Sequence, residues 1–110
     1  MKVKLSNTKM TFGDQLQIDA GIKVGDFMFV FKIKDADEFG FHKADIEQAK
    51  AMVCSKVKED RSTGLLYIQP TDPPVGFINA LMRNDTQLRK QLRVEKLDMD
   101  GVSIYIIKKD

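Results

Sequence analysis

The sequence contains a single cysteine, Cys54, and no tryptophan among its 110 residues. One cysteine excludes an intramolecular disulfide, so a hydrophobic core has to hold the fold together. A lone thiol, and an N-terminus without the apolar run of a signal peptide, are typical of a reducing compartment, and we expect a cytoplasmic protein. No apolar run is long enough to span a membrane, so we expect no membrane partner.

Neither sign of charge dominates the composition. Lysine and arginine number 18 against 16 aspartates and glutamates, which leaves a net charge of +2, too small to indicate a nucleic-acid binder by itself. The 43% of hydrophobic residues suffice for a core and argue against intrinsic disorder. A chain of this length suits one domain, and we expect residues 1–110 to form a single domain.

The residue patterns of catalysis and cofactor binding are also missing. His42 is the only histidine, and no obvious nucleophile or second acid is near it in the sequence; Asp45, three residues on, could only orient it. Cys54 adjoins an apolar helical stripe, as buried structural thiols do. Residues 98–101, DMDG, share a fragment with calcium loops but lack the closing glutamate, and there is no glycine-rich phosphate loop. We therefore expect no enzyme, no metal site and no cofactor.

Residues 15–34 alternate between apolar and polar side chains, and Gly25-Asp26 is typical of a two-residue hairpin turn. We predict a long antiparallel hairpin over residues 15–34. Its register turns one set of side chains toward the core: Ile18, Ala20, Ile22, Val24, Phe27, Phe29, Phe31 and Ile33. Met28 and Val30 then lie on the opposite side of this hairpin.

Two segments show apolar residues at helical spacing. The first is about 43–59, where Ile46, Ala49, Val53 and Val57 recur on one side. The second is about 75–92, and its apolar arc also contains Asp85. A buried carboxylate is costly, so either one long helix leaves Asp85 at the rim, or the helix breaks and Asn84 or Asp85 caps a second one. A short strand is predicted between them over residues 65–69.

Both ends of the chain favour hairpins. In residues 93–108 the dipeptide Asp100-Gly101 is a strong turn signal, and it pairs Met99 with Val102 and Leu97 with Ile104. At the other end, a short hairpin would use Val3, Leu5, Met10 and Phe12 as its apolar positions. The predicted fold class is α+β: a mainly antiparallel sheet with the two helices packed on one face.

The favoured function is a small intracellular, non-catalytic protein-binding module: an inhibitor, adaptor or assembly factor. Its size and lack of chemistry are typical of accessory proteins of phages and other mobile elements. The candidate contact surface is the strip of Met28 and Val30, unless the N-terminal hairpin or Phe39 and Phe41 cover it. An acidic region nearby would attract a basic partner: Asp35, Asp37 and Glu38. An exposed strip would equally suit a second copy of the chain, so a homodimer stays open.

The alternative function is nucleic-acid binding through a basic flank of the second helix. Four residues form this flank: Arg83, Arg89, Lys90 and Arg93. If the helix breaks near Asp85, the order of elements over residues 43–108 resembles a winged helix-turn-helix, with residues 86–93 as the reading helix. Asp98 and Asp100 weigh against this arrangement, because an acidic wing tip would repel phosphates.

Overall fold

The computed structural model describes residues 1–6, 9–33, 38–70 and 91–108. In these residues the elements follow one another as β1 (Lys2–Leu5), β2 (Met10–Phe12), α1 (Asp14–Ala20), β3 (Phe27–Lys32), β4 (Phe39–Ala44), α2 (Ile46–Ala51), β5 (Ser55–Lys56), β6 (Lys58–Glu59), β7 (Leu66–Ile68), β8 (Gln91–Met99) and β9 (Val102–Ile107). The described chain thus contains mainly short strands, joined by loops and turns, and two short helices.

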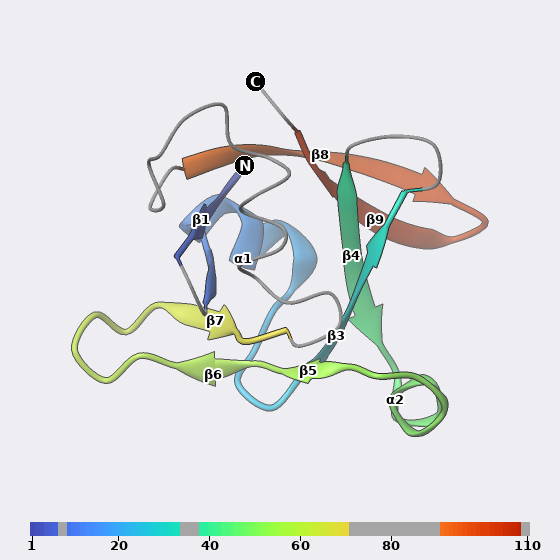
Figure 1. The fold of residues 1–110 in the computed structure, drawn as a ribbon, viewed down its shortest axis with the longest axis horizontal. Helices are drawn as coiled ribbons and strands as arrows, with labels where there is room; N and C mark the ends of the chain where they lie inside the picture. The colour runs from blue at the N-terminus through green and yellow to red at the C-terminus, as the bar shows by residue number, and fades with distance from the viewer. Residues whose placement is uncertain (7–8, 34–37, 71–90, 109–110) are drawn as a thin grey trace.

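The strands form one antiparallel sheet in the order β5-β3-β4-β9-β8-β1-β2-β7-β6. The two strands at the ends of this order, β5 and β6, are separated in the chain only by Val57. The sheet therefore curls until its ends meet, and the result is a near-closed barrel. Figure 1 shows β5 and β6 following each other along the lower edge of the molecule.

Strand β8 divides the barrel into two parts. Its first residues pair with β1, in the register Lys2↔Arg93, and its remaining residues pair with β9, in the register Leu97↔Ile104. We call the part made of β1, β2, β6, β7 and the start of β8 sheet A, and the part made of β3, β4, β5, β9 and the rest of β8 sheet B. Side chains alternate between the barrel interior and the outer face on each strand.

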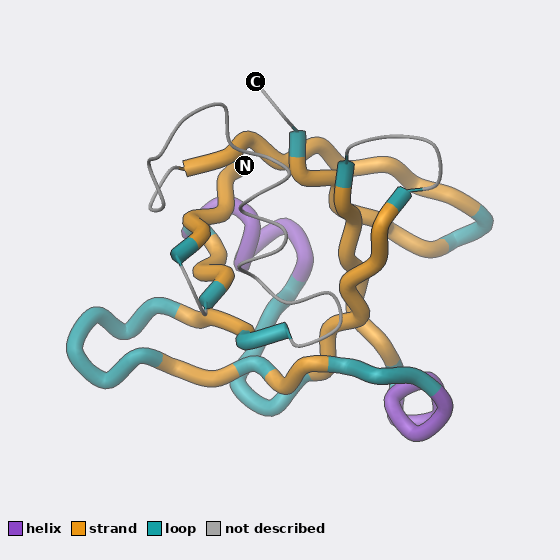
Figure 2. The backbone as a smooth tube through the Cα atoms, viewed as in Figure 1, coloured by secondary structure: helices purple, strands orange, loops and turns teal. Residues whose placement is uncertain are grey.

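Helix α1 lies inside the outline of the strands (Figures 1 and 2). It contributes Leu16 to the core, and Gly21 ends it in the left-handed conformation at φ 63°, where glycine carries no steric cost. The buried hydrophobic residues of the barrel are Val3, Leu5, Met10, Phe12, Leu16, Ile22, Met28, Val30, Phe39, Phe41, Val57, Leu66, Ile68, Leu92, Val94, Tyr105 and Ile107. One core thus joins both sheets to α1.

The predicted hairpin over residues 15–34 is wrong. Residues 14–20 are helical, and β3 pairs with β4 instead, in the register Phe29↔His42. The inward side of β3 is also the reverse of the predicted one: Met28 and Val30 are buried, whereas Phe27, Phe29, Phe31 and Ile33 are only partly covered. The bend at Gly25-Asp26 leads from α1 into β3 and pairs with Val57 rather than closing a hairpin.

The predicted helix over residues 43–59 is also wrong, because this segment contains the end of β4, the short α2, and β5 and β6. Ile46 and Val53, expected in a buried stripe, are 69% and 61% exposed. The strand over residues 65–69 is confirmed as β7, and the predicted helix over 75–92 lies mostly outside the described residues, with Gln91 and Leu92 already in β8. The overall arrangement is therefore a curled antiparallel sheet to whose core α1 contributes Leu16, not a sheet with two helices on one face.

Both terminal hairpins are confirmed, the C-terminal one with its predicted pairs and the N-terminal one with its four apolar positions buried. In the first, Val3 pairs with Phe12 and Leu5 with Met10. In the second, Met99 pairs with Val102 across Asp100-Gly101, both of which adopt positive φ angles. Among the described residues, neither helix is long and apolar enough to cross a membrane.

Candidate functional site

The candidate site is the outer face of sheet B, which carries apolar side chains where a barrel usually turns polar ones to water. Three neighbouring strands contribute to it, and by register the outward residues are Phe27, Phe29, Phe31, His42, Ala44, Ile104 and Ile106. Met28 and Val30, the predicted contact residues, point the other way and are 0% and 3% exposed. They belong to the core, so neither can reach a partner.

Aromatic rings fill the centre of this face. Phe29 and Phe31 stack with their centroids 5.8 Å apart, and the His42 ring lies 5.6 Å from Phe29 and 6.1 Å from Phe31. Gly40, opposite Phe31, makes room for the Phe31 ring, since a Cβ at residue 40 would lie 2.7 Å from Phe31 Cζ. The rings therefore lie against the sheet, half-buried, and form a firm apolar surface.

The β8–β9 hairpin extends this surface. Its outward side chains Leu97, Met99 and Val102 are 45%, 51% and 44% exposed. Met99 lies opposite Val102 across the hairpin, and Leu97 lies opposite Ile104. In Figure 1 the hairpin projects beyond the rest of the barrel. We call the outward side chains of β3, β4 and this hairpin the apolar face. The sequence predicts the pairs Leu97–Ile104 and Met99–Val102 in its hairpin part, but not that these side chains face outward.

A hollow of about 630 Å³ opens at one end of the apolar face. Phe27 and Ala44 line it from the sheet, and the exposed Ile46 lines it from α2. Asp45 and Glu47 add carboxylates to the same wall, and we call this the acidic hollow. Asp45 also caps α2, because its side chain accepts a hydrogen bond from the Gln48 amide at 2.8 Å.

The predicted acidic contact residues are not brought together with this site. Glu38 precedes β4 and forms an ion pair with Lys108, with 2.9 Å between Oε2 and Nζ. Asp35 and Asp37 lie outside the described residues. The acidic charge beside the apolar face comes instead from Asp45 and Glu47 at the start of α2.

Of the predicted nucleic-acid contacts, only Arg93 is described. It lies in β8 with its side chain exposed, and its guanidinium is 3.7 Å from the Glu95 carboxylate. Arg83, Arg89 and Lys90 lie outside the described residues. The winged helix-turn-helix arrangement fails in the part that is described, because its first helix, residues 43–59, is mainly strand and turn.

Tyr105 and Cys54 are two ionisable side chains whose pKa values the fold raises. Tyr105 is buried and donates a hydrogen bond to Asp19 at 2.9 Å, and burial together with that bond raises the pKa of Tyr105 to about 12. Burial also raises the pKa of the Cys54 thiol, which disfavours the thiolate that a nucleophile requires. Within the described part of the chain, no three His, Cys, Asp or Glu side chains gather as a metal site would need.

Comparison of the chain with protein-family models, with curated proteins and with solved structures finds no match.

Proposed function

We propose that this chain is a non-catalytic, intracellular protein-binding module, and that the apolar face is its contact surface. The observation that carries the proposal is the projecting hairpin, where Leu97, Met99 and Val102 are each about half exposed. Contiguous apolar surface is rare on soluble proteins unless it meets a partner, because each exposed apolar area costs free energy in water.

The aromatic cluster supports the same function. Phe29, Phe31 and His42 pack against one another and against the sheet, so little side-chain entropy remains to be lost on binding. Aromatic side chains held in this way supply large contact areas and are enriched in the centres of protein interfaces. A binding surface on strands is also well positioned before the partner arrives.

The acidic hollow indicates the chemistry of the partner. Apolar walls from Phe27, Ala44 and Ile46 suit an apolar side chain, and Asp45 and Glu47 attract a positive charge beside it. We therefore propose a partner protein that presents an apolar segment flanked by lysine or arginine. A second copy of this chain is the competing occupant, and the test has to separate the two.

The test is selection from a random peptide display library on the immobilised protein. We expect enriched peptides with apolar residues next to basic ones, and we expect Leu97→Ser to weaken their binding about tenfold, as losing roughly 1.4 kcal/mol of apolar contact does. Asp45→Asn should weaken binding in a salt-dependent way while keeping the helix cap. Ile18→Ser is the matched control, since Ile18 is 76% exposed but lies on α1.

Three outcomes would overturn the proposal. Selection could enrich no peptide above background, or the peptides could bind Leu97→Ser and Ile18→Ser equally well. Sedimentation of the isolated protein could also reveal a dimer that Leu97→Ser dissociates, which would assign the apolar face to a second copy of the chain.

A further inference from the structure

The outer face of sheet A differs in chemistry from that of sheet B. Five strands place one outward residue each in a continuous row, and their pairing gives the order Gln91, Lys4, Thr11, Tyr67 and Lys58. Beside this row, Lys2 pairs with Arg93. With strands spaced about 4.8 Å apart, the row is roughly 19 Å long, and it contains two lysines, one amide, one threonine hydroxyl and one aromatic ring.

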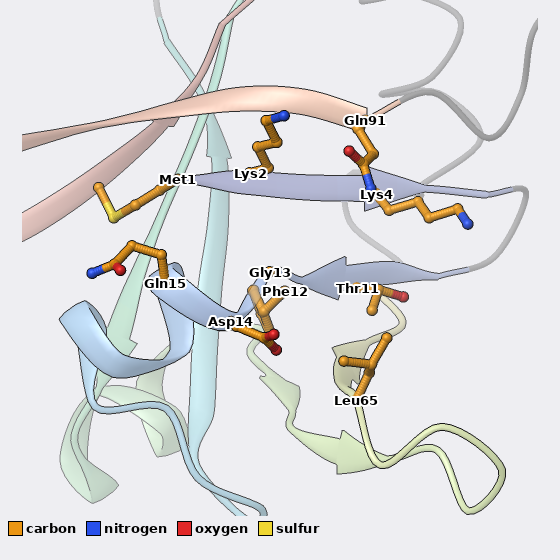
Figure 3. Close-up of a pocket in the computed structure, with 10 residues that line it drawn as sticks. All are labelled: Met1, Lys2, Lys4, Thr11, Phe12, Gly13, Asp14, Gln15, Leu65 and Gln91. Carbon is orange, nitrogen blue, oxygen red and sulfur yellow. The ribbon is translucent and has the colours of Figure 1, made fainter.

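This face is also hollowed. One hollow of about 420 Å³ includes Lys2, Lys4, Thr11 and Gln91 in its lining, and a second of about 390 Å³ includes Lys4, Lys9 and Thr11. Lys4 and Thr11 line both, so the two hollows are neighbours along the row. Figure 3 shows the first hollow lined by residues of separate segments: Lys2 and Lys4 from β1, Thr11 from β2, Gln91 from β8 and Leu65 from the residues before β7. We call the two hollows the basic groove.

Positive charge is available in the basic groove. Lys9 Nζ forms an ion pair with Asp60 Oδ2 at 3.6 Å. Arg93 Nη1 forms an ion pair with Glu95 Oε1 at 3.7 Å, and this second pair lies at the surface. Lys2 and Lys4 form no ion pair with any residue that the structure describes, and both are exposed. Asp14 is the remaining carboxylate in the lining, so lysines outnumber acids around the first hollow.

Tyr67 gives the groove a second chemistry. Its ring is half-buried on β7, next to Thr11 in the row, and Lys9 Nζ lies 4.5 Å from the ring centroid. Tyr67 lies beside the groove, because its neighbour Thr11 lines both hollows. A cationic groove with an aromatic ring beside it is how proteins hold single-stranded nucleic acid, because phosphates follow the cations and bases stack on the ring. An acidic protein would use the cations but has no need of the ring.

We propose that the basic groove binds single-stranded nucleic acid, with Lys2 and Lys4 contacting phosphates and Tyr67 stacking on a base. A duplex fits less well, since reading its major groove requires a helix or a ribbon that can enter it. The ribbon that projects here, β8–β9, carries Asp98 and Asp100 near its end. Arg93 borders the groove, and it also belongs to the basic flank of the second predicted helix.

The test measures binding of oligothymidylate and oligouridylate of about 15 nucleotides to the whole chain by isothermal titration calorimetry. If three cations, Lys2, Lys4 and Arg93, each meet a phosphate, the logarithm of the association constant should fall with that of salt concentration at a slope of about −2. Lys4→Gln should reduce the slope by about 0.7. Comparing the two oligonucleotides shows whether DNA or RNA is preferred.

Variants at Tyr67 separate stacking from charge. Tyr67→Leu should weaken binding about 5- to 150-fold, whereas Tyr67→Phe keeps the ring and should bind like the wild type. Lys50→Gln is the control for net charge, because Lys50 is exposed on α2, outside the groove. Circular dichroism of each variant checks that the fold is unchanged.

The proposal is overturned if neither oligonucleotide binds at low salt, or if Lys4→Gln and Lys50→Gln weaken binding equally. It is also overturned if polyglutamate binds as tightly and loses affinity with the same variants, which would assign the groove to an acidic protein. Leu97→Ser should leave oligonucleotide binding unchanged, so the proposals for the apolar face and for the basic groove are tested independently.

Discussion

At the scale of single residues, Tyr105 links the inner side of sheet B to helix α1. Its hydroxyl donates to Asp19 at 2.9 Å, and Lys96 approaches the same carboxylate to 3.5 Å. We expect Tyr105→Phe to lower the free energy of unfolding by about 1.5 kcal/mol, because a hydrogen bond to a charged group is lost while the ring stays in place. Urea unfolding at neutral pH measures the difference.

The same substitution has a defined pH dependence. Because the folded-state pKa of Tyr105 is raised from 10.0 to about 12, the stability that it contributes is fully present below pH 10 and is lost as the pH rises toward 12. The stability difference between the wild type and Tyr105→Phe should therefore shrink across that window. A difference that stays constant up to pH 12 would contradict the role given to this hydroxyl.

Single residues also explain why the faces of β3 were reversed in the sequence-based prediction. The alternating positions along FMFVFK define two faces, but apart from Lys32 the side chains of both sets are apolar, so hydrophobicity alone does not choose the inner one. The choice depends on the partner strand. Gly40, opposite Phe31, leaves space for that ring outside the barrel, and this information lies nine residues away in the chain.

At the scale of elements, α2 is held by its ends rather than by the core. It buries no side chain, and the Asp45–Gln48 capping box satisfies its first amides. We expect Asp45→Ala to speed hydrogen exchange of the Ala49 and Met52 amides about fivefold, as losing roughly 1 kcal/mol of capping does, while global stability changes by less than about 0.5 kcal/mol. Asp45→Asn is the matched control, and it should exchange like the wild type.

A large drop in global stability for Asp45→Ala would contradict this view of α2, since it would mean that the helix unfolds together with the barrel. Exchange measured by mass spectrometry on peptides covering residues 46–52 distinguishes the two cases, because amides of β3 and β4 should keep their protection.

Elements with local turns could be predicted, and those decided by distant contacts could not. Asp100-Gly101 fixes the last hairpin by its own backbone preferences, and the first hairpin also pairs neighbours in the chain. The segment from Leu16 to Ala20 satisfies a strand period and a helical i, i+4 contact equally, and Gly21 in its left-handed conformation favours the helix end. The helical spacing around Val53 was misleading because it came from two short strands and one turn of helix.

At the scale of the whole molecule, stability depends on how the sheet closes. Val57 joins the two end strands and is fully buried, and its amide and carbonyl bond to Asp26 and Gly25 at 2.7 and 3.0 Å. We expect Val57→Ala to lower the free energy of unfolding by about 2 kcal/mol, from the lost methyl burial and the cavity left behind. Denaturation followed by circular dichroism measures it.

Because one core joins sheets A and B, the Val57→Ala variant should still unfold in a single transition. Two separate transitions would show instead that the halves of the barrel are independent units. Such closure could not be predicted from the sequence, since β1 meets β8 and β4 meets β9 across most of the chain length, and local periodicity carries no information about those pairings.

The positions of the two tyrosines have a practical consequence. The chain has no tryptophan, so its intrinsic fluorescence comes from Tyr67 on the outer face of sheet A and from Tyr105 in the core beneath sheet B. Each ring therefore emits from a different half of the barrel. Removing the buried emitter with Tyr105→Phe leaves Tyr67 as the sole fluorophore, and quenching of its emission would then report occupancy of the basic groove without any attached label.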